Sequence, residues 1–226
     1  MRNQFDRQLN DLNGQLITMG HMVEQAIEHA IEAMVHRDVE KAKKNLAYDE
    51  EVDQQERDIE TLCMKLLMKQ QPVAKDLRLI SAALKMITDM ERIGDQAADI
   101  SEISISLAGE SDLPKMDIIR KMAAESMLMV VNSIEAFVAR DMEQAEQVTA
   151  KDDEIDQLFA DARSALIEMI QKETIKPEVA VDLLMVAKYF ERIGDHATNI
   201  AEWVMFSITG SHKSADAVNA AVIQSR

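Results

Sequence analysis

Two copies of the pentapeptide Glu-Arg-Ile-Gly-Asp, at residues 91–95 and 191–195, place paired carboxylates in this chain. In each copy the glutamate and the aspartate are four residues apart, so on a helix both side chains lie on one face, one turn apart. Carboxylate oxygens are the ligands that hard and borderline metal ions prefer. The repeated pentapeptide therefore predicts two acidic sites on helices that bind metal ions.

Further acidic residues stand at the same helical spacing in both halves of the chain. Asp49 and Asp53 precede the first pentapeptide, and their counterparts precede the second at an offset of 152 − 49 = 103 residues. Antiparallel packing would bring each of these pairs toward the pentapeptide of its own half. The predicted metal ligands are Asp49, Asp53, Glu91, Asp95, Asp99, Asp152, Asp156, Glu191, Asp195 and Asn199.

The position of the carboxylates favours metal binding over a solvated acidic face, which is the alternative. The stripe that contains Ile80 and Ile87, together with Leu77 and Leu84, predicts a core seam that continues into the first pentapeptide. A carboxylate on such a seam is costly to bury unless a cation neutralises it. An all-oxygen site selects iron, manganese, magnesium or calcium, and zinc also fits.

An enzyme is the less favoured interpretation of the same residues. A carboxylate-bridged metal-dependent hydrolase would use two metal ions to activate water. The sequence has no Glu-x-x-His pattern of the ferritin-like type, no nucleophile elbow, no Walker loop and no Gly-rich dinucleotide turn. We therefore expect a protein without catalytic residues.

Gly94 and Gly194, inside the two pentapeptides, predict close approach of another helix or of an ion cluster, because glycine weakens a helix by ~0.5–1 kcal/mol relative to alanine. Arg92 and Arg192 point away from the carboxylate stripe and are expected to pair with acids on a neighbouring helix.

Six long helices are expected to position these side chains, because the chain has 6 Gly and 3 Pro among 226 residues and few aromatic residues. Breaks fall at 37–38 and 140–141, and a Gly-to-Pro linker occupies 109–114. The expected helices cover residues 5–35, 39–69, 72–108 and 115–139, then from the break at 140–141 to 172, and 177–210.

The pattern of breaks and carboxylates repeats, so the chain is a tandem duplication with an all-α fold. Three long helices joined by short connections must run up, down and up, which predicts two three-helix bundles related by a pseudo-twofold axis. The expected divisions are residues 1–109, residues 110–209 and a polar C-terminal tail over residues 210–226.

The composition indicates the cellular environment of the protein and the classes of partner that it can bind. The net charge of −16 disfavours direct binding to nucleic acid or to anionic lipid surfaces. One cysteine, Cys63, fits a reducing cytosol, and the N-terminus has no apolar signal-peptide core. No apolar run approaches the ~18 residues of a membrane span. We therefore expect a soluble, cytoplasmic protein that does not insert into membranes.

Residues 189–203, Tyr-Phe-Glu-Arg-Ile-Gly-Asp-His-Ala-Thr-Asn-Ile-Ala-Glu-Trp, and their echo over 89–100 resemble the signature of the PhoU family of phosphate-uptake regulators. The resemblance covers about residues 5–209, and Gln96 stands where the family usually has histidine. It implies two three-helix bundles in a cytoplasmic protein that is often a homodimer. It also implies multinuclear iron or zinc clusters on the acidic pairs.

The function that the resemblance implies is negative regulation. Family members restrain phosphate uptake and the phosphate-starvation response, and they are thought to link the ATPase of a phosphate ABC transporter to a sensor histidine kinase. The expected protein is therefore a metal-binding adaptor of phosphate homeostasis.

Overall fold

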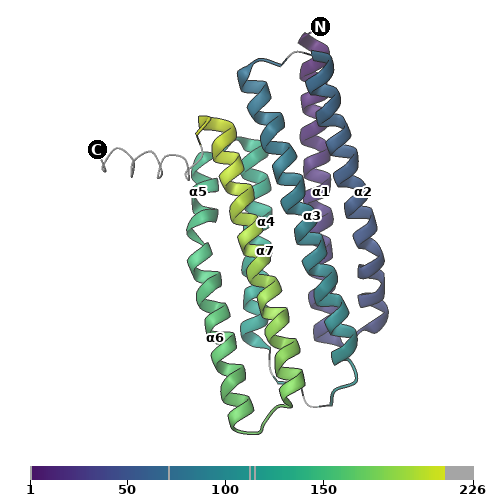
Figure 1. Cartoon of the computed structure of the whole chain (residues 1–226), viewed down its shortest axis with the longest axis vertical. Coiled ribbons are helices and arrows are strands. Elements are labelled where there is room, and N and C mark those ends of the chain that lie inside the picture. The colour runs from purple at the N-terminus through teal and green to yellow at the C-terminus, as the bar shows by residue number, and fades with distance from the viewer. Residues whose placement is uncertain (1, 71, 112, 115, 212–226) are drawn as a thin grey trace, which may run out of the picture.

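The computed structural model describes residues 2–70, 72–111, 113–114 and 116–211, and this part of the chain contains only helices, turns and short connections. Figure 1 shows long helices that run side by side along the longest axis of the molecule. The helices are α1 (Arg2–His36), α2 (Val39–Gln70), α3 (Ala74–Leu107), α4 (Asp117–Ala139), α5 (Met142–Ala150), α6 (Asp152–Gln171) and α7 (Pro177–Thr209).

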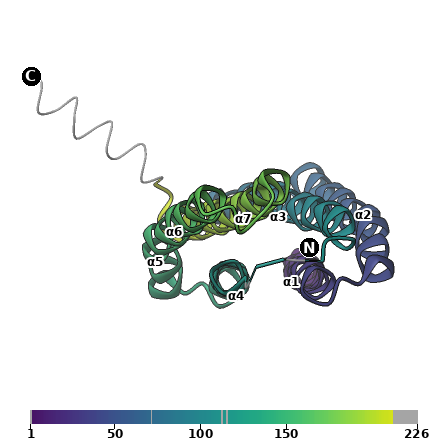
Figure 2. The same cartoon turned by 90° about the horizontal axis from the view of Figure 1, so that it is seen from below.

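The two halves pack side by side through their equivalent helices. Seen from below, α2, α3, α7 and α6 form one curved layer, and α1 and α4 lie on its concave side (Figure 2). Contacts between α3 and α7 join the halves in the first layer, and contacts between α1 and α4 join them in the second. The buried apolar residues form one continuous cluster through both halves. The predicted tandem arrangement of three-helix units is confirmed.

The core seam of α3 lies slightly to one side of the predicted stripe. Its buried positions follow a three-and-four spacing through Ile80, Ala83, Ile87, Met90, Gly94 and Ala97. Extending this seam backwards gives position 76, so Leu77 lies off it and is 48% exposed, contrary to the prediction. Glu91 and Asp95 likewise flank the seam instead of continuing it, so they lie at the edge of the core.

The duplicated breaks have the same construction in both halves. Arg37 and Arg140 both have a φ of 56°, which ends one helix in the left-handed region. The next residue caps the following helix. The carboxylate of Asp38 accepts a hydrogen bond from the Lys41 amide at 3.0 Å, and that of Asp141 accepts one from the Gln144 amide at 3.1 Å. Such caps contribute about 0.5–2 kcal/mol each, which explains why the Arg-Asp pairs mark the breaks.

The expected fifth helix is interrupted at Lys151, giving α5 and α6. Here the Lys151 amide bonds to the Val148 carbonyl at 3.0 Å and the Glu154 amide to the Lys151 carbonyl at 3.0 Å, which is the tighter three-residue pattern. The equivalent helix of the first half, α2, is continuous. Most of the predicted polar tail, residues 212–226, lies outside the described residues.

Helix α4 is long and apolar enough to span a membrane by composition, which differs from the expectation that no segment comes close. Half of its most apolar window is buried within the protein, and α4 packs against α7, α5, α6 and α1. Its apolar face, which includes Met122, Val130 and Phe137, belongs to the shared core. The high hydropathy of α4 is therefore that of a core helix.

Candidate metal centre

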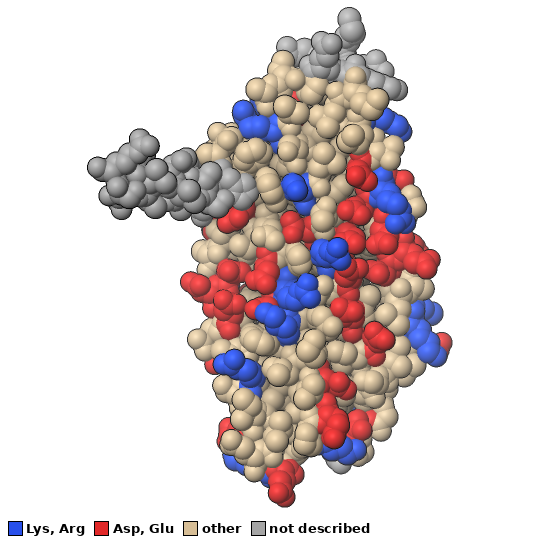
Figure 3. All heavy atoms as spheres, in the orientation of Figure 1, with Lys and Arg blue, Asp and Glu red and all other residues tan. Residues whose placement is uncertain are grey.

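Acidic side chains gather on the face formed by the first layer. Figure 3 shows them in two groups, one over α2 and α3 and the other over the opposite half, with lysine and arginine side chains between the two. The predicted metal ligands belong to the four helices of this layer, α2, α3, α6 and α7.

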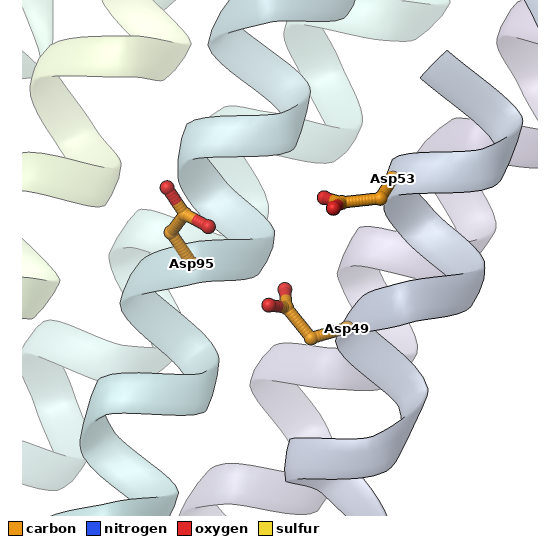
Figure 4. Close-up of side chains that lie close together, drawn as sticks. All are labelled: Asp49, Asp53 and Asp95. Carbon is orange, nitrogen blue, oxygen red and sulfur yellow. The ribbon is translucent and has the colours of Figure 1, made fainter. Parts of the chain in front are cut away.

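In the first half, three carboxylates from two helices converge. Asp49 and Asp53 are one turn apart on α2 and point toward Asp95 on α3 (Figure 4). One oxygen from each lies within 4.8 Å of one oxygen from each of the others, and all three residues are partly buried. In the described part of the chain this is the one compact group of three or more acidic, histidine or cysteine side chains suited to an ion.

Gly94 allows the two helices to approach at this point. A Cβ atom at Gly94 would lie 3.1 Å from Val52 Cγ1 and 3.3 Å from the Oδ1 atom of Asp49. In the second half, a Cβ atom at Gly194 would lie 3.3 Å from Ile155 Cγ2. The predicted close approach of another helix at both glycines is confirmed.

Two carboxylate oxygens of the first centre accept no hydrogen bond. Asp49 Oδ1 and Glu91 Oε2 are both buried, and neither accepts a hydrogen bond. Burial, followed by the charges of Asp95 and Asp53, raises the pKa of Asp49 to about 6. Burial and the charge of Asp95 also raise the pKa of Glu91. Partly buried carboxylates that crowd one another in this way are suited to a cation.

Arg92 pairs within its own helix, not with a neighbouring helix as the sequence suggested. Its Nη1 atom lies 2.8 Å from Asp95 Oδ2, and its Nε atom lies 3.4 Å from Glu91 Oε2. The side chain of Arg92 is 52% exposed, so solvent screens both contacts. Arg92 therefore lies at the rim of the centre and leaves the second oxygen of Asp95 to face α2.

The second half has the same residues in a different electrostatic setting. Lys188 Nζ donates to both carboxylate oxygens of Glu191, 2.6 Å from Oε1. Asp152 accepts a hydrogen bond from Thr198 Oγ1 at 3.1 Å, and Asp156 is exposed. Asp195 is also exposed as a whole, but neighbouring side chains desolvate its carboxyl group. This desolvation, with the charges of Glu191 and Asp152, raises the pKa of Asp195 to about 6.

Asp99 and Asn199, the remaining predicted ligands, lie at the contact between the halves. Burial raises the pKa of Asp99 on α3, and the nearby hydroxyl of Tyr189 on α7 opposes this rise. Asn199 Nδ2 donates to Asp89 Oδ1 at 3.1 Å, and His196 Nδ1 lies 2.9 Å from the same oxygen. These contacts tie α3 to α7. Their part in metal binding stays a prediction.

Asp89 is the residue of this face that the sequence did not reveal. Its side chain is only 15% exposed and binds two residues of the other half. The position equivalent to Asp89 in the second half is Tyr189, at the offset of 100, so the duplication gave no signal for an acidic residue there.

The model of the PhoU domain matches this chain twice, over residues 16–104 and 119–204. The chain belongs to the PhoU family. It is 34% identical over 207 residues to a phosphate-specific transport system accessory protein PhoU homologue from Clostridium acetobutylicum, covering 91% of this chain and 94% of that protein. Each half of the all-helical fold thus corresponds to one PhoU domain.

Solved PhoU structures have the same fold. The crystal structure of PhoU from Pseudomonas aeruginosa is 31% identical, with a TM-score of 0.87 over 92% of this chain and all of that one. The crystal structure of the phosphate transport system regulatory protein PhoU from Streptococcus pneumoniae is 26% identical, with a TM-score of 0.86 over 92% and 98% of the two chains. These relatives are named as accessory or regulatory proteins of the phosphate transport system.

Proposed function

We propose that this protein is a metal-binding adaptor that restrains phosphate uptake and phosphate-starvation signalling. The family match over both halves supports the regulatory part of the proposal, since relatives are named as accessory or regulatory proteins of the phosphate transport system. Its partners would be the ATPase of a phosphate ABC transporter and a sensor histidine kinase. The protein would act in the cytoplasm, as a homodimer.

The convergence of Asp49, Asp53 and Asp95 is the observation that carries the metal-binding part. The all-oxygen donor set and the unpaired buried oxygens of Asp49 and Glu91 fit a hard or borderline ion. Iron and zinc are the proposed metals, and manganese and magnesium also suit these ligands. In the second half, Asp152, Asp156, Glu191 and Asp195 are the corresponding proposed ligands.

A bound ion would supply positive charge on an otherwise acidic face. Such a charge orients an acidic side chain or a phosphate group of a partner, because a multivalent ion is the largest local charge in its site. The protein's own carboxylates hold the ion and set the shape of this contact. The proposed units are residues 1–109 and 110–209, each with one acidic site, followed by the tail over 210–226.

A starvation reporter in the source bacterium tests the regulatory proposal. Deletion of the gene is expected to make the reporter constitutive in high phosphate, and the wild-type gene is expected to restore repression. A folded Asp49→Asn, Asp95→Asn variant is expected to restore it only in part. A reporter that stays silent after deletion contradicts the regulatory role. Full repression by the variant would mean that the metal has only a structural role.

Elemental analysis of the purified protein tests metal binding directly. We expect iron, zinc or manganese in the wild type, at a level that falls in the Asp49→Asn, Asp95→Asn variant. Equal and negligible metal in the two proteins would identify the carboxylates as a solvated acidic face.

A further inference from the structure

The two acidic sites differ at a pair of equivalent positions beside the predicted ligands. Thr88 corresponds to Lys188 at an offset of 188 − 88 = 100, and Glu56 corresponds to Phe159 at an offset of 159 − 56 = 103. In the first half, Thr88 Oγ1 lies 3.5 Å from Glu56 Oε1. In the second half, Lys188 Nζ lies 5.3 Å from the centre of the Phe159 ring. The first pair carries one negative charge and the second pair one positive charge.

The Lys188 side chain is 42% exposed, and its ammonium group makes two contacts within the second half. Its ammonium group contacts both oxygens of Glu191, whose side chain is only 12% exposed. The face of the Phe159 ring attracts the same ammonium group. Both oxygens that Glu191 would offer to a metal ion are therefore already bound to a cation of the protein.

The first half has no lysine at the equivalent position, and its cations contact the site from the rim. Arg92 contacts Glu91 and Asp95 from a half-exposed position, and Arg57 Nη1 lies 3.6 Å from Asp53 Oδ2 with both side chains exposed by more than a third. With these contacts in place, neither Asp49 Oδ1 nor Glu91 Oε2 accepts a hydrogen bond. Glu56 adds a further negative charge, which helps to raise the pKa of Glu91.

We propose that Lys188 is a built-in counter-cation that weakens metal binding in the second half, so that the protein binds its tightest ion at Asp49, Asp53 and Asp95. This inference rests on the proposed metal-binding function and assigns different roles to the two sites. The equivalent pairs, Thr88 with Glu56 and Lys188 with Phe159, determine the difference.

Titration of the metal-free protein with Mn²⁺, followed by the electron paramagnetic resonance signal of the free ion, locates the tight site. Asp95→Asn is expected to abolish the tightest binding, and Asp195→Asn is expected to leave it in place. Isothermal titration calorimetry with Zn²⁺, and with Fe²⁺ under anaerobic conditions, covers the other proposed ions. Equal losses from the two substitutions would contradict the role of Lys188 but leave metal binding itself intact.

Exchange of the residues at the two equivalent positions tests the role of Lys188 itself. In the Asp95→Asn background, Lys188→Thr is expected to strengthen Mn²⁺ binding at the second site on the order of tenfold, because it removes a neighbouring positive charge. In the Asp195→Asn background, Thr88→Lys is expected to weaken binding at the first site by a similar factor. Lys172→Thr is the matched control, because Lys172 pairs with Glu168 on the surface of α6.

Circular dichroism establishes whether each variant is folded. If one of the two exchange variants is unfolded, the other still tests the proposal independently. Unchanged affinity in the folded exchange variants would overturn the proposal. Absence of binding of all three ions to the wild type would overturn both this inference and the metal-binding function, which distinguishes that failure from failure of the asymmetry alone.

Discussion

The protonation of Asp49 in the acidic centre makes the stability of the metal-free protein depend on pH. Its pKa is raised from an ordinary value of 3.8 to about 6, so between these values the folded state binds more protons than the unfolded state. The free energy of unfolding therefore falls as pH rises from about 4 to about 6, and the loss persists at higher pH.

We expect Asp49→Asn to remove this loss. In the presence of a chelator at pH 7, the variant should be more stable than the wild type by about 1–2 kcal/mol, and this advantage should disappear near pH 4. Urea denaturation at several pH values measures the difference. The exposed Asp11→Asn on α1 is the control, and an Asp49→Asn profile parallel to the wild-type profile would contradict the assignment.

At the scale of the helices, Gly94 sets the distance between α2 and α3. We expect Gly94→Ala to lower stability by about 1 kcal/mol, since the new Cβ would press on both Val52 and Asp49 and outweigh the gain in helix propensity. It should also weaken Mn²⁺ binding, because Asp49 is displaced.

Two other glycines provide matched comparisons for this prediction. For Gly194→Ala the three atoms nearest to the new Cβ all belong to Ile155, so this substitution should have a smaller effect on stability and on metal binding. Gly14 has nothing within 4 Å of an added Cβ, so Gly14→Ala should stabilise the protein by about 0.5–1 kcal/mol. Thermal unfolding and Mn²⁺ titration measure both effects, and the same response at all three positions would refute the packing argument.

The order and type of the helices follow from local patterns in the sequence. The left-handed turns at Arg37 and Arg140 and their aspartate caps are encoded within a few residues, so the breaks were predictable. The apolar spacing also identifies Ile80 and Ile87 as core. The spacing did not show that Leu77 lies off the seam. One position along a helix turns the side chain by about 100°, and apolar residues stand both at the seam positions and next to them.

The features that the sequence did not predict depend on contacts between segments far apart. Whether Arg92 pairs with acids of its own helix or of α2 depends on the distance between Arg92 and α2. The burial of Asp89 depends on the packing of α7 against α3. The interruption at Lys151 has no glycine or proline to mark it. The spacing of Asp49, Asp53 and Asp95 predicted their convergence, since helical periodicity and antiparallel packing suffice to bring them together.

For the molecule as a whole, Asp89 is a polar link between the halves. We expect Asp89→Ala to destabilise the protein by about 1–3 kcal/mol, because His196 loses its partner in a partly buried contact and Asn199 loses its partner at the surface. Chemical denaturation checks this value. Asp58→Ala is the control, because Asp58 is exposed and accepts a hydrogen bond from Gln54 on its own helix. An equal effect of the two substitutions would contradict the link.

The shared core makes a prediction about the separate halves. A fragment of residues 1–109 would expose the faces of α1 and α3 that normally pack against α4 and α7. We expect this fragment to self-associate or to lose its cooperative unfolding transition, whereas the whole chain should unfold in one transition. Light scattering and calorimetry measure both properties, and a monomeric fragment with a sharp transition would show that each half folds independently.

The interruption at Lys151 changes the electrostatic environment of the acidic residues in the second half. Because α6 begins at Asp152, its first turn contains Asp152, Asp153 and Glu154. The aligned peptide dipoles of a helix leave partial positive charge at its N-terminus, which stabilises each carboxylate there by about 0.3–1 kcal/mol. Asp49 lies well inside α2, far from such a terminus. The carboxylates of Asp49, Asp53, Glu91 and Asp95 thus recur in the second half, where the peptide groups at the start of α6 offset part of their charge.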